Sequence, residues 1–521
     1  MTTETAPESP ANTLREQLER MLLAPVRAFR IQYLPLLMVY FAYGAMGLVA
    51  VADSFWVRKE LTLSPAALAQ LGVWLTLPWA VKMIFGELVD TVALAGSRRR
   101  GYVFLGAGMV AAGLVLLAGA AGKWLTFAAP ETLYIAAQLL TVLGVVLQDV
   151  VADAMSTEVV PRTTPDGTPR PQPDIDHDLG MVQILGRLAL SIGAVSVAGL
   201  SGWLAAHLPY ETVFLLGLAI PAISASGALI VKLESSESRP TDWRILGGGL
   251  AFGAFVLGIS IFDLPYAQEL TFAVSLAVVV AMLARVTADI APETKLRILY
   301  AALIIFFFRA TPGVGEGYRW FTIDVLGFDE AFYGVLNQIG ALIALAAAWF
   351  LSDVITRMPV ARVLLWLTLL GTALSVPTLL LVNRGDLWTS THLGLDARGI
   401  AIIDAAAASP LAQLSMVPLL TLIAIYAPPS RRAVWFALMA SFLNLALVAG
   451  QLATKYLNMI FVIERGNYAE LPALVWTATI LGFLVPLAAI LAFGGRLRPN
   501  TTPPPQPSRE KVADEPRTND P

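Results

Sequence analysis

The sequence predicts an all-α polytopic membrane protein with fourteen transmembrane helices and both termini in the cytoplasm. Of its 521 residues, 57% are apolar and only 14% are charged, and the mean hydropathy is +0.69. A soluble protein carries about 25% charged residues, so this chain has too few charges to cover a soluble surface. The apolar segments give the number of helices, and the basic residues between them give their direction.

Each apolar segment has the length of a membrane-spanning helix. A bilayer core about 30 Å thick requires roughly 20 helical residues, whereas the strands of a membrane barrel would alternate over about 10 residues. The fourteen predicted spans cover residues 33–53, 66–90, 101–121, 133–157, 180–205, 211–232, 245–263, 268–288, 298–322, 332–353, 361–382, 400–426, 432–456 and 472–494.

Basic residues support an even number of spans. With a cytoplasmic N-terminus, the predicted inner segments carry far more Lys and Arg than the outer ones. This is the bias of the positive-inside rule, and the loss of one helix would invert every later segment and destroy it. We therefore expect both termini to lie inside.

Composition divides the chain into five parts. A cytoplasmic segment (1–32) precedes an N-terminal six-helix bundle (33–232). A polar hinge and two extra helices (233–297) lead to a C-terminal six-helix bundle (298–494), and a proline-rich tail (495–521) is expected to be disordered.

A weak internal repeat relates the two bundles. Residues 55–72 (FWVRKELTLSPAALAQLG) and 320–337 (WFTIDVLGFDEAFYGVLN) both place an aromatic pair, a turn with a leucine and a helix start at matching offsets. Repeated six-helix halves are typical of secondary transporters.

The end of the second span carries a short polar motif. Gly86 and Asp90 are followed by Arg98, Arg99 and Arg100. The glycine lets two helices approach closely, and the aspartate can accept hydrogen bonds from the arginines. This pattern resembles the loop motif of the major facilitator superfamily, which implies the major facilitator fold and a gate at this position.

Longer blocks of sequence are more specific. Residues 39–103 resemble the start of the folate–biopterin transporter family, with Leu-Pro-Trp, a lysine, a glycine, an aspartate and an arginine run in order. Further blocks match at 148–162, 308–328, 402–420 and 436–450. The resemblance implies secondary transport of a small organic anion such as a folate or pterin, without a cofactor.

Four charged residues fall at a similar depth within the predicted N-terminal bundle. They are Lys82, Asp149, Asp153 and Arg187. A charge inside the bilayer costs a few kcal/mol, so each is expected to have a partner. The cluster is either a structural set of ion pairs or a proton relay in which Asp149 alternates between an arginine and a proton.

Arg309 lies near the middle of the ninth span and stands where the family usually has glutamine. Pro312, Gly313, Gly315 and Gly317 follow it and predict a break in the helix. Broken helices at mid-membrane form the substrate sites of transporters, and a guanidinium there can hold a carboxylate with two hydrogen bonds. The alternative is that Arg309 pairs with Glu316.

Several other polar residues are candidates for the same cavity. Glu316 could carry a coupling proton or be paired to Arg319. Tyr43, Asn444 and Gln413 are expected to contact substrate, although such groups more often join helices to one another.

A second gate element is expected between the bundles. Relative to the family pattern, Glu87 is a gained acid and Arg432 replaces an acid. These two changes are consistent with an ion pair that closes the cytoplasmic side, although the positive-inside rule alone also places an arginine there.

No motif of an enzyme or of an ATP-driven pump occurs. We expect no metal, no cofactor and no nucleic acid partner. The chain is predicted to be a monomeric, proton-coupled transporter, multi-pass in a bacterial inner membrane, with a small-molecule substrate. The alternatives are a transporter or exporter of another solute, such as a peptidoglycan fragment, an organic acid or a drug, and a non-transporting assembly factor of the same fold.

Overall fold

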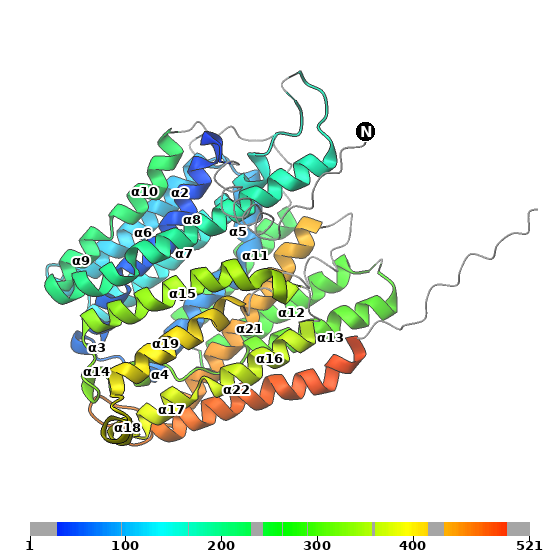
Figure 1. Ribbon diagram of the computed structural model, residues 1–521. Helices are drawn as coiled ribbons and strands as arrows, with labels where there is room; N and C mark the ends of the chain where they lie inside the picture. The colour runs from blue at the N-terminus through cyan, green and yellow to red at the C-terminus, as the bar shows by residue number, and fades with distance from the viewer. Residues whose placement is uncertain are drawn as a thin grey trace, which may run out of the picture.

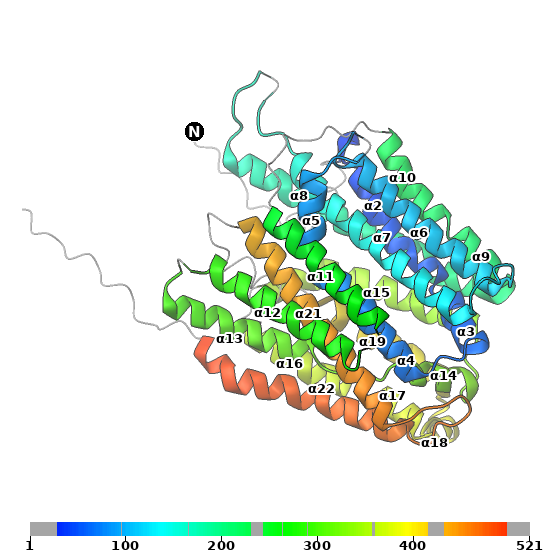
Figure 2. The ribbon, with the colours of Figure 1, turned by 180° about the vertical axis from the view of Figure 1, so that it is seen from behind.

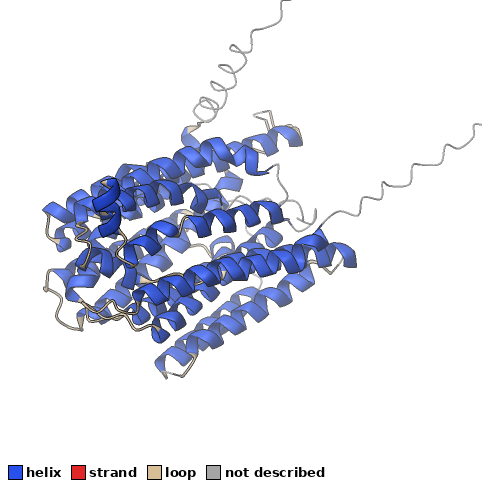
Figure 3. Cartoon of the chain, turned by 60° about the horizontal axis from the view of Figure 1, so that its bottom comes forward, coloured by secondary structure: helices blue, strands red, loops and turns tan. Residues whose placement is uncertain are grey.

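The described part of the chain consists of helices and the turns between them (Figure 3). The computed structural model describes residues 29–94, 96–164, 166–230, 243–262, 264–288, 290–356, 360–414 and 432–497. Most of the predicted N-terminal segment (1–32), of the polar hinge and of the C-terminal tail (495–521) lies outside these residues.

The described helices follow one another along the chain. Their bounds are α2 Leu34–Ala45, α3 Ala50–Glu60, α4 Pro65–Ala80, α5 Lys82–Thr91, α6 Arg100–Ala121, α7 Pro130–Glu158, α8 Gln172–His207, α9 Tyr210–Leu216, α10 Ala219–Ile230, α11 Trp243–Ile261, α12 Ala267–Val286, α13 Pro292–Arg309, α14 Glu316–Asp324, α15 Glu330–Thr356, α16 Val360–Ala373, α17 Val376–Val382, α18 Asp386–Leu393, α19 Ala397–Leu414, α21 Arg432–Ile460 and α22 Leu471–Phe493, with 3₁₀ turns at Ile31–Tyr33, Met46–Val49 and Gly494–Leu497.

The helices form two layers that correspond to the two predicted halves (Figure 1). In the N-terminal half, α6 packs on α7, and α2 packs between α8 and α10. In the C-terminal half, α22 packs on α13 and α16, and α15 packs on α19. The halves meet where α4 packs along α21 and where α8 packs along α15.

Glycine makes the second of these interfaces close. A Cβ on Gly202 of α8 would lie 2.4 Å from the Cα of Gly334 of α15, so no larger residue fits without a shift of backbone. Small residues of this kind allow helices in a membrane to approach and gain van der Waals contact. The two halves are therefore held in direct backbone contact at this point.

The two extra helices lie on one side of the molecule. α12 packs against α21 and α4, and α11 packs against α5 and α12 (Figure 2). Lys455 of α21 forms an ion pair of 2.7 Å with Glu269 of α12, and the Gln268 amide donates to the Gln70 carbonyl. These contacts attach α12 to the interface between the halves.

The described part of every predicted span is mainly helical. Ten stretches are long and apolar enough to cross a membrane, and α4 with α5 forms an eleventh that is bent by 42°. The remaining three predicted spans are 245–263, whose apolar helix is shorter (Gly247–Val256), 298–322, which is divided between α13 and α14, and 400–426, which continues beyond residue 414 outside the described residues. The count of fourteen and the cytoplasmic termini stay predictions.

The helix bundle has two ends, which we call the rim end and the basic end. The rim end carries Lys59, Tyr210 and Glu330, and the basic end carries Asp90, Arg99 and Glu158. α4 runs from the rim end toward the basic end, and α21, packed along it, runs in the opposite direction. The position of a residue along α4 or α21 therefore tells how far it lies from the rim end.

Candidate functional site

The predicted break in the ninth span is present. α13 ends at Arg309 and α14 begins at Glu316. Pro312 has no N–H with which to continue the helix, and Gly315 has a φ of +80°, a conformation that favours glycine. Proline and glycine thus separate one span into two helices at the residues that the sequence indicated.

Two side chains of α21 hold the break in its conformation. The Thr454 hydroxyl accepts a hydrogen bond of 2.8 Å from the Gly313 amide, and the Asn458 amide donates to the Val314 carbonyl at 3.2 Å. Both side chains are buried. They satisfy backbone groups that the missing helical turn leaves without partners, and neither residue was predicted from the sequence.

A cavity of about 340 Å³ lies on one side of the break. It is formed by α4 of the N-terminal half and by the break and α21 of the C-terminal half, so it lies between the two halves. Its lining residues are Leu68, Ala69, Gly72, Arg309, Thr311, Gly313, Gly315, Glu316, Leu447, Gly450, Gln451 and Thr454. We call it the first cavity.

A second cavity of about 410 Å³ lies on the other side of the break. Thr311 lines both cavities, Gly313 and Gly315 line the first, and Pro312 and Val314 line the second. Such alternation is that of an extended segment, whose successive residues face opposite sides. The break is therefore a wall between two cavities, and its glycines expose backbone to the first.

The structure brings Arg309 and Glu316 together as residues of the first cavity. Glu316 also lies 3.7 Å from Arg319 one turn along α14, which is the alternative partner that the sequence allowed. Arg319 in turn donates to the Ser54 hydroxyl of the N-terminal half. Ser54 and Arg319 directly precede the two segments of the predicted repeat (55–72 and 320–337), so the two halves meet next to these segments.

Two other predicted substrate residues, Asn444 and Tyr43, lie closer to the basic end than the first cavity does. Asn444 donates to the Trp79 carbonyl at 3.0 Å, and the Tyr43 ring stacks on Trp79 with centroids 5.7 Å apart. Trp79 lies two helical turns from Gly72 of the first cavity, or about 10 Å toward the basic end. These contacts join α2, α4 and α21 on the side of the first cavity that faces the basic end.

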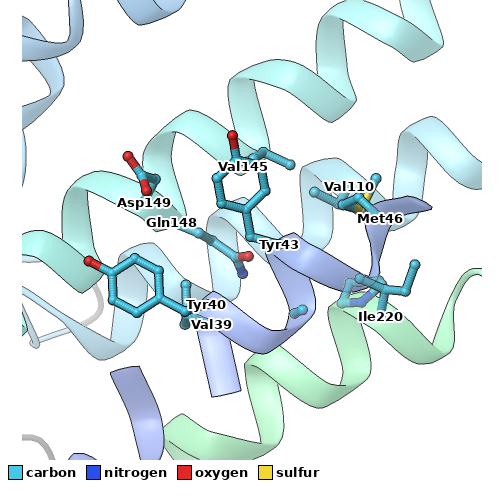
Figure 4. Close-up of a pocket in the computed structure, with 11 residues that line it drawn as sticks. Val39, Tyr40, Tyr43, Met46, Val110, Val145, Gln148, Asp149 and Ile220 are labelled. Atoms are coloured by element: carbon cyan, nitrogen blue, oxygen red, sulfur yellow. The ribbon is translucent and has the colours of Figure 1, made fainter. Parts of the chain in front are cut away.

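Tyr43 also borders a small pocket within the N-terminal half (Figure 4). Tyr40 and Tyr43 of α2 face Gln148 and Asp149 of α7 there. The pocket has a volume of about 10 Å³, which is room for one water molecule. It is therefore too small to be the substrate site.

Two predicted residues have side chains outside the described part of the structure. They are Gln413 on α19 and Arg432 at the start of α21. The proposed pair of Glu87 and Arg432 thus stays a prediction, although α5 and α21 are in contact.

The predicted charged layer is present and centres on Lys82. Its ammonium forms ion pairs with Asp149 and, at 2.6 Å, with Asp153, whose carboxylate also accepts from the Tyr40 hydroxyl at 2.8 Å. Arg187 is close enough to act on Asp149 electrostatically, but within the described residues it makes no salt bridge of 4 Å or less to either aspartate. The direct partner of Asp149 is thus the lysine rather than the arginine.

At the basic end, Arg99 joins three helices. Its guanidinium contacts Asp90 at 2.7 Å and Glu158 at 2.6 Å, and it donates to the Val89 carbonyl at 3.0 Å. Arg99 is only 4% exposed. Asp90 and Arg99 therefore pair as the loop motif predicts, and Glu158 is a partner that the sequence analysis missed.

At the rim end, charged residues link the two halves. Arg58 pairs with Asp324, which also accepts from Tyr468, and Lys59 pairs with Glu330 at 2.8 Å. The Tyr210 hydroxyl donates to Glu330 at 2.7 Å. The two halves are thus bonded together at this end.

Further rim contacts involve backbone. Arg465 donates to the carbonyls of Val57 and Arg58, at the C-terminus of α3, and stacks over Trp320 at 4.6 Å. Near the start of α15, the Phe332 amide and the Arg398 guanidinium lower the pKa of Asp329. The contacts of Arg465 and Arg398 were not predicted, because they join segments that are distant in sequence, whereas Asp329 and Phe332 are only three residues apart.

Comparison with known proteins identifies the family. The model of the BT1 family matches residues 44–497, which include both halves, the break and both cavities. The chain belongs to the BT1 family. This agrees with the resemblance carried by the sequence blocks.

Two related sequences cover most of this BT1 chain. A folate-biopterin transporter of Synechocystis sp. is 27% identical over 476 residues, which are 90% of this chain and 82% of the relative. A protein of Arabidopsis thaliana named "Probable folate-biopterin transporter 4" is 23% identical over 85% of this chain and 91% of its own. The family members that this chain resembles are named as transporters and not as enzymes.

Solved structures share the fold. A POT family transporter crystallised with 5-aminolevulinic acid superposes with a TM-score of 0.62 at 15% identity, over 90% of this BT1 chain and 96% of the other. This likeness shows the fold, and the apolar helices together with the family show a multi-pass integral membrane protein, as predicted.

Proposed function

We propose that this BT1 protein is a proton-coupled secondary transporter that moves a folate or pterin anion by alternating access. The observation that carries the proposal is the first cavity. It lies between the two halves, contains Arg309, and is bordered by a broken helix whose glycines expose backbone. These are the features of substrate sites in secondary transporters.

Two features of the cavity can bind an anion, and the one carboxylate among its described lining residues, that of Glu316, lies 3.7 Å from Arg319. Arg309 supplies a positive charge with a planar pair of donors. The N-terminus of α14 begins at Glu316 beside the same cavity, and helix N-termini attract negative charge. Family relatives named as folate-biopterin transporters support a pterin-containing substrate.

In alternating access, the space between the two halves opens at one end of the molecule while contacts between the halves close the other end. In this proposal the rim end lies outside the cell and both termini lie inside. The rim contacts then close the outer side, and the first cavity opens toward the cytoplasm. Breaking the contacts of Asp324 and Glu330 and closing Glu87 on Arg432 would produce the outward-open state. Gly86, Asp90 and Arg98 to Arg100 would guide this movement at the basic end.

Two sets of residues are candidates for proton coupling. Glu316 lines the first cavity and forms an ion pair with Arg319. Lys82, Asp149, Asp153 and Arg187 form the second set, in which a proton on Asp149 would weaken the ion pair with Lys82. We further propose that the protein acts as a monomer in a bacterial inner membrane.

Reconstitution into proteoliposomes tests the function. We expect uptake of radiolabelled folate or biopterin that increases when the exterior is made acidic relative to the lumen and that a protonophore reduces. Liposomes without protein are the control. Absence of uptake, counterflow and binding for both compounds would contradict the proposed substrate class, and uptake that ignores the pH gradient would contradict proton coupling alone.

A further inference from the structure

The second cavity differs in chemistry from the first. Its described lining residues are Phe308, Thr311, Pro312, Val314, Leu367, Thr368, Gly371, Thr372, Ser375, Leu411, Ala478, Thr479, Gly482 and Pro486. None of these residues is charged, whereas the first cavity holds Arg309 and Glu316. A carboxylate has no cationic partner among the described residues of the second cavity.

Hydroxyl groups of α16 and of Ser375, in the turn that follows α16, line this cavity. The hydroxyls of Thr368, Thr372 and Ser375 donate to the carbonyls one turn earlier, of Leu364 at 2.8 Å, Thr368 at 2.8 Å and Gly371 at 3.1 Å. Because each hydroxyl proton is used within the helix, the oxygen atoms keep lone pairs that can accept further hydrogen bonds. This wall therefore offers acceptors rather than donors.

The opposite wall adds another acceptor. Pro486 lies inside α22 and has no N–H, so the Gly482 carbonyl lacks the donor that a helix normally supplies from four residues later. Gly482 and Pro486 both line the cavity. Gly482 is half-buried and lines the cavity, so its carbonyl can accept a hydrogen bond from a ligand that brings donors.

We propose that the second cavity is a subsite for the uncharged, hydrogen-bond-donating ring of the substrate whose carboxylate is held at Arg309. The inference rests on the proposed function and divides the substrate site into two. A volume of about 410 Å³ lies within the range of ligand pockets. The amino and ring N–H groups of a pterin are donors of the kind that these walls accept.

The two cavities adjoin at the break, where one ligand can reach from one to the other past Thr311. Thr311 is shared by the two cavities, and the two glycines of the break give no side chain that would separate a ligand from the backbone. An elongated anion could thus pass beside the break with its acidic end at Arg309. A pterin without a carboxylate would occupy the second cavity alone.

Fragment binding to the purified full-length protein tests this division. The probes are folate, biopterin, which has the ring without a carboxylate, and 4-aminobenzoylglutamate, which has the carboxylates without the ring. The test variant combines Thr372→Val with Ser375→Ala. The matched control is Thr477→Val on α22, whose hydroxyl donates to Ala473 at 2.8 Å in the same way but is half-buried and lines neither cavity.

We expect the double variant to bind folate and biopterin about tenfold more weakly, since each lost hydrogen bond is worth about 0.5–1.5 kcal/mol. Binding of 4-aminobenzoylglutamate should stay unchanged, and the control should bind all three probes normally. Thr479→Val, on the other wall, provides a second variant if the first does not fold.

Equal weakening of both fragments, or unchanged biopterin binding in both variants, would overturn the division of the site while leaving the proposed function intact. Failure of the unaltered protein to bind any of the three probes would overturn the proposed substrate class and this inference with it.

Discussion

Replacing Arg309 with glutamine is expected to weaken the binding of folate by roughly ten- to hundredfold while leaving the protein folded. A hydrogen bond to a charged group is worth about 1.5–3 kcal/mol, and each 1.4 kcal/mol is about a factor of ten in affinity. Removal of a charge from the membrane interior does not itself cost stability. Titration of the purified variant with folate, followed by the shift in melting temperature, measures the effect.

Arg309→Lys is the informative control for this prediction. It keeps the charge but lacks the planar pair of donors that matches a carboxylate, so its affinity should lie between those of the unaltered protein and Arg309→Gln. If Arg309→Gln binds and transports folate with unchanged affinity and rate, Arg309 is not a substrate ligand. Its role would then be structural.

Replacing Lys82 with methionine is expected to destabilise the protein by about 3–5 kcal/mol, the cost of breaking a buried ion pair by removal of one partner. Asp149 would be left with a buried charge, since its carboxylate is mostly covered. Adding Asp149→Leu should recover much of the loss, because Asp153 is half-exposed and tolerates a free charge. The free energy of unfolding in a mixed-micelle titration measures the full cycle.

Two comparisons make the Lys82 experiment specific. Lys123→Met removes an exposed pair with Glu60 at 3.3 Å and should cost less than about 1 kcal/mol. A cycle between Arg187 and Asp149 should give a smaller coupling energy than the cycle with Lys82, because no salt bridge joins them within 4 Å. Additive effects of Lys82→Met and Asp149→Leu would rule out the ion-pair cluster.

Features that depend on position along one helix could be predicted from the sequence. The break after Arg309 follows from proline and glycine, which act on their own turn of the backbone. The common depth of Lys82, Asp149 and Asp153 follows from counting residues from the helix ends. Asp90 and Arg99 are near one another in sequence, so a short motif was sufficient to pair them.

Features that depend on how two distant helices are rotated could not be predicted. Arg187 acts on Asp149 only electrostatically, because the rotation of α5, α7 and α8 about their axes places Lys82 rather than Arg187 in contact with Asp149. Thr454 and Asn458 are ordinary polar residues of an apolar helix until α21 packs against the break. The second cavity was missed for the same reason, since its walls come from α13, α16 and α22.

The most direct test of the account is whether substrate occupies the first cavity. Because the chain contains no cysteine, Gln451→Cys places a single thiol on the cavity wall, and Ser409→Cys places one in a separate pocket beside α15. The rate of alkylation by a small maleimide is measured for each, with and without saturating folate. We predict that folate slows labelling at position 451 several-fold and leaves position 409 unchanged. Folate that is bound or transported but leaves the labelling rate at position 451 unaltered would contradict the assignment of this cavity as the substrate site.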